Sequence, residues 1–382
     1  MAVMREKITE NILLWDKLKN ARKPVVLYGM GDGADKILAC CEKNKIDIAD
    51  IFASDEFVRG HYFRGYKVKK LSEIQENIGD FIILVAFATR DPQILARIYE
   101  LGEKYELYVP DMPVIGRGDF YDYFPESIYA PDKSAKFERV YELLADDKSR
   151  EVYLDVINFR ISGKLKYLQT ANTPKPEALK LLQLEKNPGM HYVDLGAYDG
   201  DSILELLNEY KYSENIGKII AVEPDRKNFA KLQKNLAENN LLENCTLHNI
   251  GVWRERQNIY FSEKAGRHSS VTVPGESQNS RMKIHEIPVD TVDNIISASM
   301  PEENCRYFIK YDVEGSEYEA ILGSAATLKK YSPALAVSLY HRSEDLVELP
   351  LLINTLNPSY KIYLRKHEYV PCWDLNLYVT PE

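Results

Sequence analysis

Apolar and polar positions alternate in two ways along the first third of the chain. Short apolar runs have the length of buried strands, and between them apolar residues recur every three or four positions, as in helices. The strand-like runs lie at residues 24–29, 48–54, 81–88 and 106–110, and the helical stretches at residues 34–45 and 94–105. Strands that alternate with helices predict a parallel sheet with helices on both faces. We therefore expect a Rossmann-like α/β unit over residues 1–116.

The same alternation returns in the C-terminal half. Its strand-like runs lie at residues 191–196, 218–223, 245–252, 258–262, 307–315, 334–340, 360–365 and 375–380. Helical stretches separate most of these runs, and residues 262–283 form a long polar loop. This pattern predicts a second Rossmann-like α/β unit over residues 187–382.

The segment between the two units, residues 117–186, carries helical spacing but no strand-like run. It is typical of a helical connector, with a break at the Asn-Thr-Pro sequence of residues 172–174. Residues 1–20 predict an amphipathic helix with apolar positions at Ile8, Ile12, Trp15 and Leu18.

The composition of the chain limits the binding partners and the cellular compartment that we expect for it. The 382 residues include 49 Lys and Arg against 58 Asp and Glu, and the net charge of −9 disfavours nucleic acid and anionic membranes. The N-terminus is too charged for a signal peptide, and no apolar run approaches the roughly 20 residues of a membrane span. Five cysteines without CxxC spacing indicate reduced thiols. We expect a cytoplasmic protein with no nucleic-acid or membrane partner, and homo-oligomer formation stays open.

The strongest chemical signal lies at the start of the second unit. Asp194 stands near the end of a predicted strand, and Gly196 and Gly200 stand in the turn that follows. In a doubly wound sheet, ligands bind at the carboxyl ends of the strands, and glycine allows their close approach. The next strand ends at Glu223, where a carboxylate can accept hydrogen bonds from both hydroxyls of a ribose.

The charges in this turn distinguish between cofactors. It lacks the GxGxxG pattern of a pyrophosphate binder, and it carries Asp199 and Asp201 in addition to Asp194. Acidic residues repel a phosphate and suit a cationic ligand. S-adenosylmethionine has an ammonium, a sulfonium and a ribose diol, so the sequence favours it over NAD. Each feature alone also occurs in α/β proteins without a ligand; their order at successive strand ends favours binding.

The second unit resembles the FkbM-type methyltransferases, which have the class I S-adenosylmethionine-dependent fold. The resemblance covers roughly the last half of the chain and rests on residues 193–202, 220–236, 249–253, 308–328, 338–353 and 360–367. The sequence Asp-Val-Glu-Gly-Ser-Glu at residues 312–317 is its most specific piece. The resemblance implies a seven-stranded sheet whose last strand is antiparallel. It also implies methyl transfer to oxygen, often on sugars.

The resemblance further implies roles for individual residues. The turn after the first strand would line the methionine end of the cofactor, Glu223 would hold the ribose, and Asp312 would face the methyl group. The turn at residues 249–251 would lie near the adenine. The complete predicted cofactor set is Asp194, Gly196, Ala197, Tyr198, Asp199, Gly200, Glu223, Pro224, Asp225, Asn249, Gly251 and Asp312.

Two groups are candidates for the base that removes the proton of the acceptor. One is the carboxylate pair Asp312 and Glu314, and the other is His341, whose ordinary pKa suits a base near neutral pH. The same three residues offer oxygen and nitrogen ligands to a divalent cation, although their spacing does not require one. The structural alternatives are a helix cap for Glu314 and a structural hydrogen bond for His341.

Candidate acceptor-binding residues lie in the polar loop and after the later strands. They are His268, Ser269, Ser270, Arg342, Arg365 and His367. The alternative for the loop is a solvated segment without a ligand.

The first unit carries a weaker signal for a second nucleotide site. Gly29, Gly31 and Gly33 fit the glycine pattern of a nucleotide fingerprint, and Asp55 ends the next strand, where a ribose-binding acid would stand. Asp32 in the same turn disfavours a pyrophosphate. The unit resembles the nucleotide-binding-like N-terminal units of some sugar-modifying transferases. Three alternatives stay open. The unit binds a nucleotide or nucleotide-sugar, it binds a regulator, or it is a vestigial fold used for dimerisation.

These features together predict an S-adenosylmethionine-dependent O-methyltransferase. The expected acceptor is a hydroxyl of a saccharide, glycan or nucleotide-sugar. One alternative is an NAD-dependent sugar oxidoreductase that uses the fingerprint of the first unit, although that unit lacks a Tyr-x-x-x-Lys pair. The other is a non-catalytic scaffold that binds S-adenosylmethionine.

Overall fold

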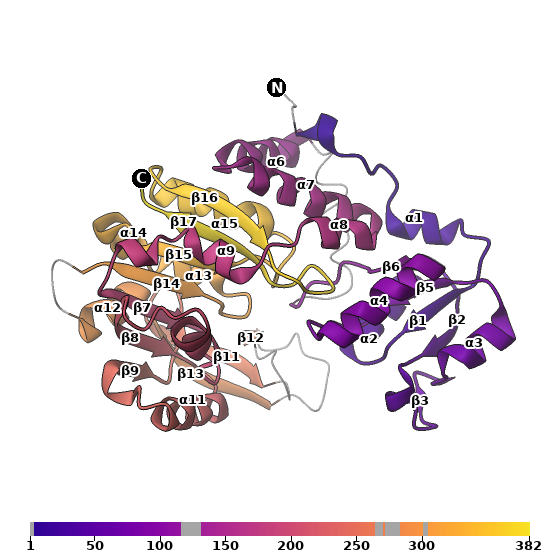
Figure 1. Ribbon diagram of the computed structural model, residues 1–382, viewed down its shortest axis with the longest axis horizontal. Helices are drawn as coiled ribbons and strands as arrows, with labels where there is room; N and C mark the ends of the chain where they lie inside the picture. Colours follow the sequence, from indigo (N-terminus) through magenta and orange to yellow (C-terminus); the bar gives the residue numbers. More distant parts are fainter. Residues whose placement is uncertain (1–3, 116–130, 264–269, 272–282, 301–304) are drawn as a thin grey trace. The chain divides into compact units, whose positions relative to one another are not determined.

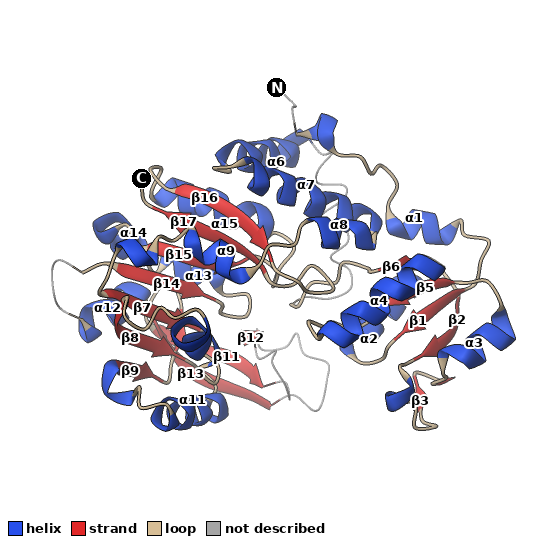
Figure 2. Cartoon of the chain, viewed as in Figure 1, coloured by secondary structure: helices blue, strands red, loops and turns tan. Residues whose placement is uncertain are grey.

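The computed structural model describes residues 4–115, 131–263, 270–271, 283–300 and 305–382. Its contacts divide the chain into two compact units, whose elements are labelled in Figure 1 and coloured by type in Figure 2. Unit 1 comprises Met1–Glu142, Asp146–Thr173 and Arg365–Leu375. Unit 2 comprises Leu143–Ala145, Pro174–Leu364 and Asn376–Glu382. A short segment near the C-terminus therefore belongs to the first unit.

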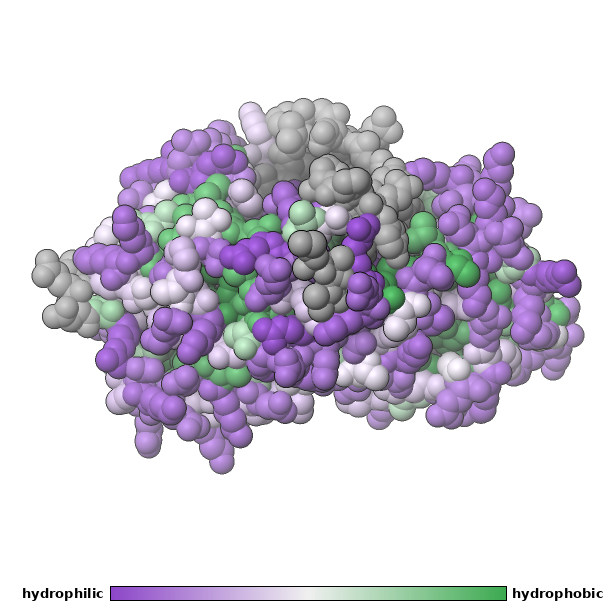
Figure 3. Space-filling model, turned by 90° about the horizontal axis from the view of Figure 1, so that it is seen from above, coloured by the Kyte–Doolittle hydropathy of each residue, from purple (hydrophilic) through white to green (hydrophobic). Residues whose placement is uncertain are grey.

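Hydrophobic residues are gathered in separate cores around the two parallel sheets. On the face of the molecule in Figure 3, hydrophilic residues predominate and hydrophobic residues form small groups between them. Among the helices of the described residues, none combines the length and the apolar character that a membrane span requires.

Unit 1 contains a parallel four-stranded sheet in the order β2-β1-β5-β6, which confirms the predicted α/β pattern. Its strands are β1 (Val25–Tyr28), β2 (Ile48–Phe52), β5 (Ile82–Val85) and β6 (Glu106–Tyr108). The helices between them are α2 (Asp32–Lys43), α3 (Leu71–Ile78) and α4 (Pro92–Lys104). The smaller elements are η1 (Arg5–Lys7), η2 (Asp55–Phe57), β3 (Tyr62–Phe63) and β4 (Tyr66–Lys67). The sequence did not predict the short helix α3.

The single amphipathic helix predicted for residues 1–20 is wrong. Only α1 (Leu14–Lys19) is α-helical in this segment. Before it, the backbone N–H groups of Thr9 and Glu10 each donate a 2.9 Å hydrogen bond to the side-chain oxygen of Asn158. Tertiary hydrogen bonds thus satisfy backbone donors that a helix would otherwise use.

From residue 131 onward, where the structure describes it, the segment predicted as a connector is helical. It forms α6 (Pro131–Leu143), α7 (Asp147–Ser162), α8 (Leu165–Thr170), α9 (Lys175–Lys180) and the 3-10 turn η4 (Leu184–Lys186). The chain passes from unit 1 to unit 2 between Thr173 and Pro174, inside the predicted Asn-Thr-Pro break. Proline at this point disfavours a helical conformation for the residue before it, which keeps α8 and α9 separate.

Unit 2 contains a seven-stranded sheet in the order β16-β17-β15-β14-β7-β8-β9. Its strands are β7 (Met190–Leu195), β8 (Ile216–Val222), β9 (Cys245–His248), β14 (Tyr307–Tyr311), β15 (Ala334–Ser338), β16 (Lys361–Lys366) and β17 (Leu375–Thr380). The last strand, β17, is antiparallel to β15. Both the number of strands and the antiparallel final strand agree with the prediction.

A second, four-stranded sheet in unit 2 was not predicted. It has the order β10-β13-β11-β12, with β10 (Gly251–Val252), β11 (Gln257–Glu263), β12 (Ser270–Val271) and β13 (Lys283–Asp290). Residues 258–262 were expected in the main sheet, but they lie in β11 and pair with β13 in antiparallel register. The predicted turn residue Gly251 begins β10.

The helices of unit 2 connect the strands of the main sheet. They are α10 (Asp201–Leu204), η5 (Glu205–Glu209), α11 (Arg226–Glu238), η6 (Leu242–Asn244), α12 (Val292–Ser299), α13 (Glu317–Leu322), α14 (Ala325–Tyr331) and α15 (Asp345–Leu356).

Gly196 allows the loops after β7 and β14 to pack backbone against backbone. Its φ of 83° lies in the left-handed region, and a Cβ built there would stand 1.9 Å from the carbonyl oxygen of Asp312. The backbone N–H of Asp312 in turn donates a 3.0 Å hydrogen bond to the carbonyl of Leu195. No residue with a side chain can replace this glycine without moving one of the two loops.

We expect Gly196→Ala to destabilise the protein by about 1–3 kcal/mol more than Gly189→Ala. Gly189 has a similar φ of 79° but open space around its Cβ position. Both variants carry the backbone strain of about 1–2 kcal/mol, so their difference isolates the collision with Asp312. Thermal unfolding of the two variants measures it, and equal losses of stability would contradict the packing described above.

Candidate functional site

The carboxyl ends of five neighbouring strands form the candidate site. Strands β15, β14, β7, β8 and β9 run parallel in consecutive pairs. The loops that follow them therefore meet at one edge of the sheet, where ligands of doubly wound folds bind. Most of the predicted cofactor and catalytic residues lie in these loops.

The loop after β7 has an unusual backbone. Gly196, Tyr198 and Gly200 all have positive φ, and Gly200 is the N-terminal cap of α10. Glu314, in the loop after β14, also has a positive φ of 51°. Left-handed conformations are uncommon for residues other than glycine, and such strain concentrates at functional sites. Tyr198 and Glu314 thus mark the two loops of this edge.

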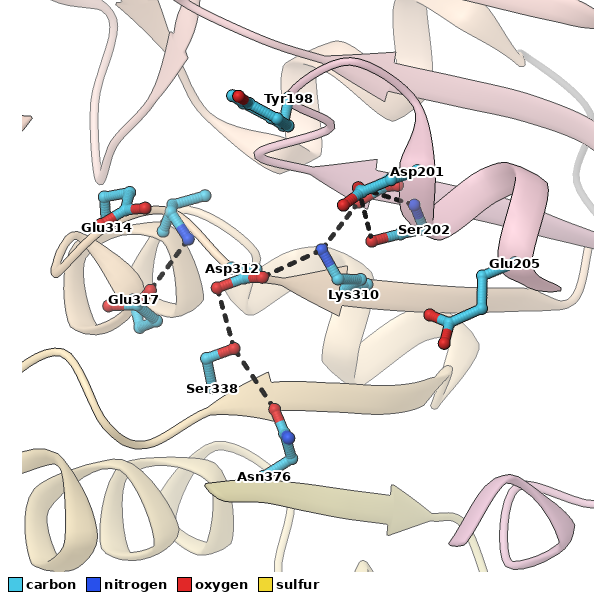
Figure 4. A network of polar contacts seen from close by, with 12 residues as sticks. Tyr198, Asp201, Ser202, Glu205, Lys310, Asp312, Glu314, Glu317, Ser338 and Asn376 are labelled. Atoms are coloured by element: carbon cyan, nitrogen blue, oxygen red, sulfur yellow. Dashed lines mark hydrogen bonds and ion pairs between the residues drawn. The ribbon is translucent and has the colours of Figure 1, made fainter. Parts of the chain in front are cut away.

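Lys310 is the central cation of the edge. Its Nζ lies 3.3 Å from Oδ1 of Asp194 and 3.2 Å from Oδ2 of Asp312. Figure 4 shows Lys310 pointing toward Asp312. Burial alone would lower the pKa of the Lys310 ammonium, but the carboxylates of Asp194 and Asp312 raise it well above its ordinary value. Lys310 therefore stays charged and joins β7 to β14.

The two carboxylates beside Lys310 differ in their pKa values. Burial raises the pKa of Asp194 to about 6, against the opposing effect of Lys310. Burial also acts to raise the pKa of Asp312, but Lys310 and His341 outweigh it and lower that pKa to about 2. Oδ2 of Asp194 is buried and makes no hydrogen bond to the part of the chain that the structure describes. This oxygen can accept a hydrogen bond from a cationic ligand.

Glu223 is held in place by two backbone groups. Its Oε2 accepts a 2.9 Å hydrogen bond from the N–H of Tyr198, and its Oε1 a 2.8 Å hydrogen bond from the N–H of Asp225. Burial raises the pKa of the Glu223 carboxyl to about 7, although both backbone hydrogen bonds oppose this. Each oxygen keeps a lone pair for a further hydrogen bond, so the carboxylate can bind a diol.

The other predicted cofactor residues stabilise the surrounding turns. The side-chain nitrogen of Asn249 donates hydrogen bonds to the carbonyl oxygens of Glu223 (2.8 Å) and Pro224 (3.2 Å). The Asp225 carboxylate caps α11 through two backbone N–H groups. The carbonyl of Asp199 accepts a 2.8 Å hydrogen bond from a side chain of α11, and Ala197 is buried. These contacts fix the turns around Glu223 rather than aim side chains at a ligand.

His341 follows β15 and is buried beside three carboxylates. Its Nδ1 lies 2.8 Å from Oε1 of Glu317, and its Nε2 lies 3.6 Å from both Asp312 Oδ1 and Glu314 Oε2. Burial alone would lower the pKa of His341, but Glu317, Glu314 and Asp312 raise it to about 10. Without a ligand, the ring is therefore protonated at neutral pH.

Three of these side chains are close enough together to hold a metal ion. Ligand atoms of Asp312, Glu317 and His341 all lie within 4.8 Å of one another. Oxygen and nitrogen ligands of this kind suit a divalent cation. The positive charges of Lys310 and His341 already balance carboxylates here, however, so the geometry does not require a metal.

Comparison with known proteins identifies this part of the chain. Residues 194–369 match the family model described as the methyltransferase FkbM domain. Residues 194–369 are therefore similar to methyltransferase FkbM domains, and we call this segment the FkbM domain below. This match confirms the resemblance drawn from the sequence. No curated protein matches the chain.

Solved structures resemble the chain to different degrees. The crystal structure of methyltransferase FkbM from Methylobacillus flagellatus KT has a TM-score of 0.70 and 21% identity, covering 99% of this chain and 97% of that chain. An rRNA methylase from Streptococcus thermophilus (12% identity, 55% of this chain, 99% of that chain) has a TM-score of 0.34. A precorrin-6y C5,15-methyltransferase from Geobacter metallireducens GS-15 (13% identity, 53% of this chain, 84% of that chain) has a TM-score of 0.30. The first match extends the shared fold to nearly the whole chain.

Two of the predicted acceptor-binding residues belong to unit 1 and not to the unit that contains the cofactor edge. Arg365 and His367 are buried in unit 1. The guanidinium of Arg365 contacts Asp146 (2.6 Å) and the hydroxyl of Ser149 (2.8 Å). Nδ1 of His367 lies 2.7 Å from the carbonyl oxygen of Thr173. These contacts give both residues structural roles within unit 1.

The remaining predicted acceptor residues are only partly described. Arg342 follows His341 in the loop after β15, and its backbone N–H donates a 3.0 Å hydrogen bond to Asp345. His268 and Ser269 lie outside the described residues. Ser270 pairs with Ser262 between β12 and β11.

The predicted second nucleotide site is rearranged. Of its residues, only Gly29 lines the pocket at the carboxyl ends of β1, β2 and β5. Gly31 and Gly33 are not among the lining residues, and a Cβ at Gly33 would stand 2.6 Å from the carbonyl of Ala86. Asp55 is exposed and lies 3.7 Å from Lys70. The fingerprint glycines thus shape the turn, and Asp55 does not reach the pocket.

The sequence analysis gave no role to Lys310 or Glu317. Lys310 is the one charged residue of β14 and stands two positions before Asp312, so the two side chains share a face of the sheet. That spacing could have identified it. Glu317 lies in the family-specific segment, but only tertiary packing brings it to His341.

The pKa of His341 makes stability depend on pH. Its value of about 10 in the folded chain exceeds the ordinary 6.5, so its ion pairs stabilise the fold fully below pH 6.5 and are lost as the pH rises through 10. We expect the stability difference between wild type and His341→Gln to shrink over this range in thermal unfolding.

His248→Gln is the matched control for this measurement. Burial lowers the pKa of His248 below its ordinary value, so the stability contributed by this group does not change in the alkaline range, where its variant should run parallel to wild type. Parallel curves for His341→Gln as well would contradict the protonated state assigned to His341.

Proposed function

We propose that the FkbM domain transfers a methyl group from S-adenosylmethionine to a hydroxyl oxygen of a saccharide, glycan or nucleotide-sugar. The observation that carries this proposal is the FkbM family match over residues 194–369, on a sheet whose edge presents Glu223 and Asp194. The saccharide acceptor follows from the resemblance to FkbM-type enzymes.

The side chains of the edge suit this cofactor. Glu223 presents a pre-positioned carboxylate to a ribose diol, because two backbone N–H groups already orient it. The buried carboxylate of Asp194 offers its unpaired oxygen to an ammonium group. When bound, S-adenosylmethionine supplies an electrophilic methyl group on a sulfonium centre.

His341 is the residue we assign as the base. Glu317, itself held by a 2.8 Å hydrogen bond from the N–H of Val313, lies against Nδ1, and Nε2 lies on the side of Asp312 and Glu314. A carboxylate at one ring nitrogen orients the other for proton transfer. Asp312 is a poorer base, because its pKa of about 2 leaves little affinity for a proton.

The protonated resting state of His341 is compatible with this role. A sulfonium cation beside Asp312 and Glu314 would oppose the effect of these carboxylates and lower the pKa of His341. The imidazole would then lose its proton when the cationic cofactor binds, and could accept one from the hydroxyl of the acceptor. Glu317 would stabilise the imidazolium that forms again.

The NAD-dependent oxidoreductase alternative gains no support. It relied on Asp55 as the ribose-binding acid, and this side chain is exposed and paired with Lys70. A scaffold that binds S-adenosylmethionine without turnover is distinguished by an activity measurement.

Glu223→Gln should weaken the binding of S-adenosylhomocysteine about 10–100-fold, because charge-assisted hydrogen bonds to the ribose are lost. Affinity of the wild type should also fall as the pH drops below about 7, where the Glu223 carboxyl gains a proton. Isothermal titration calorimetry measures both effects.

Asp225→Asn is the control for this experiment. Asparagine caps a helix as well as aspartate does, so α11 stays intact while a neighbouring charge is removed. Its affinity should stay close to that of wild type. Equal losses in the two variants, or no binding by wild type at micromolar concentration, would overturn the assignment.

His341→Gln should lower the rate of methyl transfer about 10²–10⁴-fold while leaving the affinity for S-adenosylhomocysteine within a few-fold of wild type. Transfer of labelled methyl from S-adenosylmethionine to a panel of glycosides and nucleotide-sugars measures the rate. His248→Gln should retain activity. A loss of cofactor affinity without a loss of turnover would refute the role of His341.

A further inference from the structure

Unit 1 contains a pocket that the proposed methyl transfer does not use. It lies where β1, β2 and β5 end, and its volume is about 420 Å³. In the order β2-β1-β5-β6, the next strand in the chain, β2, lies on one side of β1, and β5 lies on the other side. The strand order therefore reverses at β1, which makes this the switch point of the topology. Open α/β sheets bind ligands at such points, and the volume is within the range of about 300–1,000 Å³ typical of small-molecule sites.

The walls of the pocket are mainly aromatic and apolar. Tyr28 and Phe87 meet edge to face with ring centroids 4.9 Å apart, and Phe57 stands at the surface with half of its area exposed. Gly29 makes room for this arrangement, because a Cβ there would stand 2.4 Å from the Phe87 ring. An exposed aromatic ring beside a buried aromatic pair offers flat surfaces to a planar ligand ring.

The polar groups of the pocket are cationic or neutral. Arg59 and His61 line it from the segment before β3, and Ser54 and Thr89 line it at the ends of β2 and β5. No carboxylate is among the described lining residues. The nearby acids of α2 are engaged elsewhere, Asp32 with Lys36 and Asp35 with Arg64. A guanidinium with hydroxyl donors and no opposing acid selects an anionic group, above all a phosphate.

We propose that this pocket binds a nucleoside diphosphate, either free or as the nucleotide part of a nucleotide-sugar. The base lies against the aromatic walls, and the phosphates lie toward Arg59. The ligand is not a dinucleotide such as NAD, because the end of β2 presents Ser54 instead of an acid that would bind the adenosine ribose. This proposal concerns binding to unit 1 and does not depend on the proposed function of the FkbM domain.

The test is calorimetric titration of the full chain with UDP, GDP, ADP and NAD, in the presence of excess S-adenosylhomocysteine to occupy the edge of unit 2. We expect at least one nucleoside diphosphate to bind with a micromolar Kd, more tightly than NAD. Arg59→Ala should weaken this binding about tenfold or more, because a charge-assisted contact to phosphate is lost. Ala88→Trp should abolish it by filling the pocket.

Arg64→Ala is the matched control. Arg64 stands in the same hairpin region as Arg59, but it pairs with Asp35 and does not line the pocket. Its variant should bind the nucleotide like wild type, and thermal unfolding should show all three variants folded.

Three results would overturn the proposal. They are the absence of binding by every nucleoside diphosphate, tighter binding of NAD, and equal weakening by Arg59→Ala and Arg64→Ala. Binding that survives Ala88→Trp but is lost in Glu223→Gln would place the nucleotide in unit 2 instead. A variant that loses nucleotide binding but keeps normal methyl transfer, or one that loses methyl transfer but keeps nucleotide binding, would show that the two proposals stand or fall separately.

Discussion

The candidate site depends on one buried ammonium group held between two carboxylates. Lys310 lies between Asp194 on the neighbouring strand and Asp312 at the end of its own. Removing any of the three would leave an uncompensated buried charge, which is far more costly than the pair itself is stabilising. The triad therefore holds the loops after β7 and β14 at one separation, and Gly196 permits that separation. The positions of Glu223 and His341 relative to each other follow from it.

The same charges set the protonation states that the chemistry needs. Lys310 keeps Asp312 ionised, and Asp312 helps to keep the imidazole of His341 protonated. Asp194 and Glu223 are different, because burial outweighs their partners and raises both pKa values toward neutrality. An edge with this distribution is prepared for a ligand that brings positive charge and hydroxyl donors together.

The two units carry side chains of opposite charge at the carboxyl ends of their strands. In unit 2 the strand ends carry acids, which suit a cationic cofactor. In unit 1 the corresponding strand ends carry hydroxyls, aromatic rings and an arginine, which suit a planar anionic ligand. Similar α/β topologies thus present different chemistry at their strand ends, because the side chains of the loops differ while the sheets are alike.

The sequence by itself determined the two α/β units and the positions of Asp194, Glu223, Asp312 and His341 at strand ends, because these follow from local periodicity. The seven strands of the main sheet followed instead from the family resemblance, since periodicity also indicated a strand at residues 258–262 that belongs to the other sheet. The sequence did not determine the second sheet of unit 2, whose β11 and β13 are joined across a long stretch of chain. The sequence also did not show that Glu317 contacts His341, or that Arg365 is buried in unit 1. Tertiary structure decided these points, since pairing and charge compensation between distant segments leave no periodic trace in the sequence.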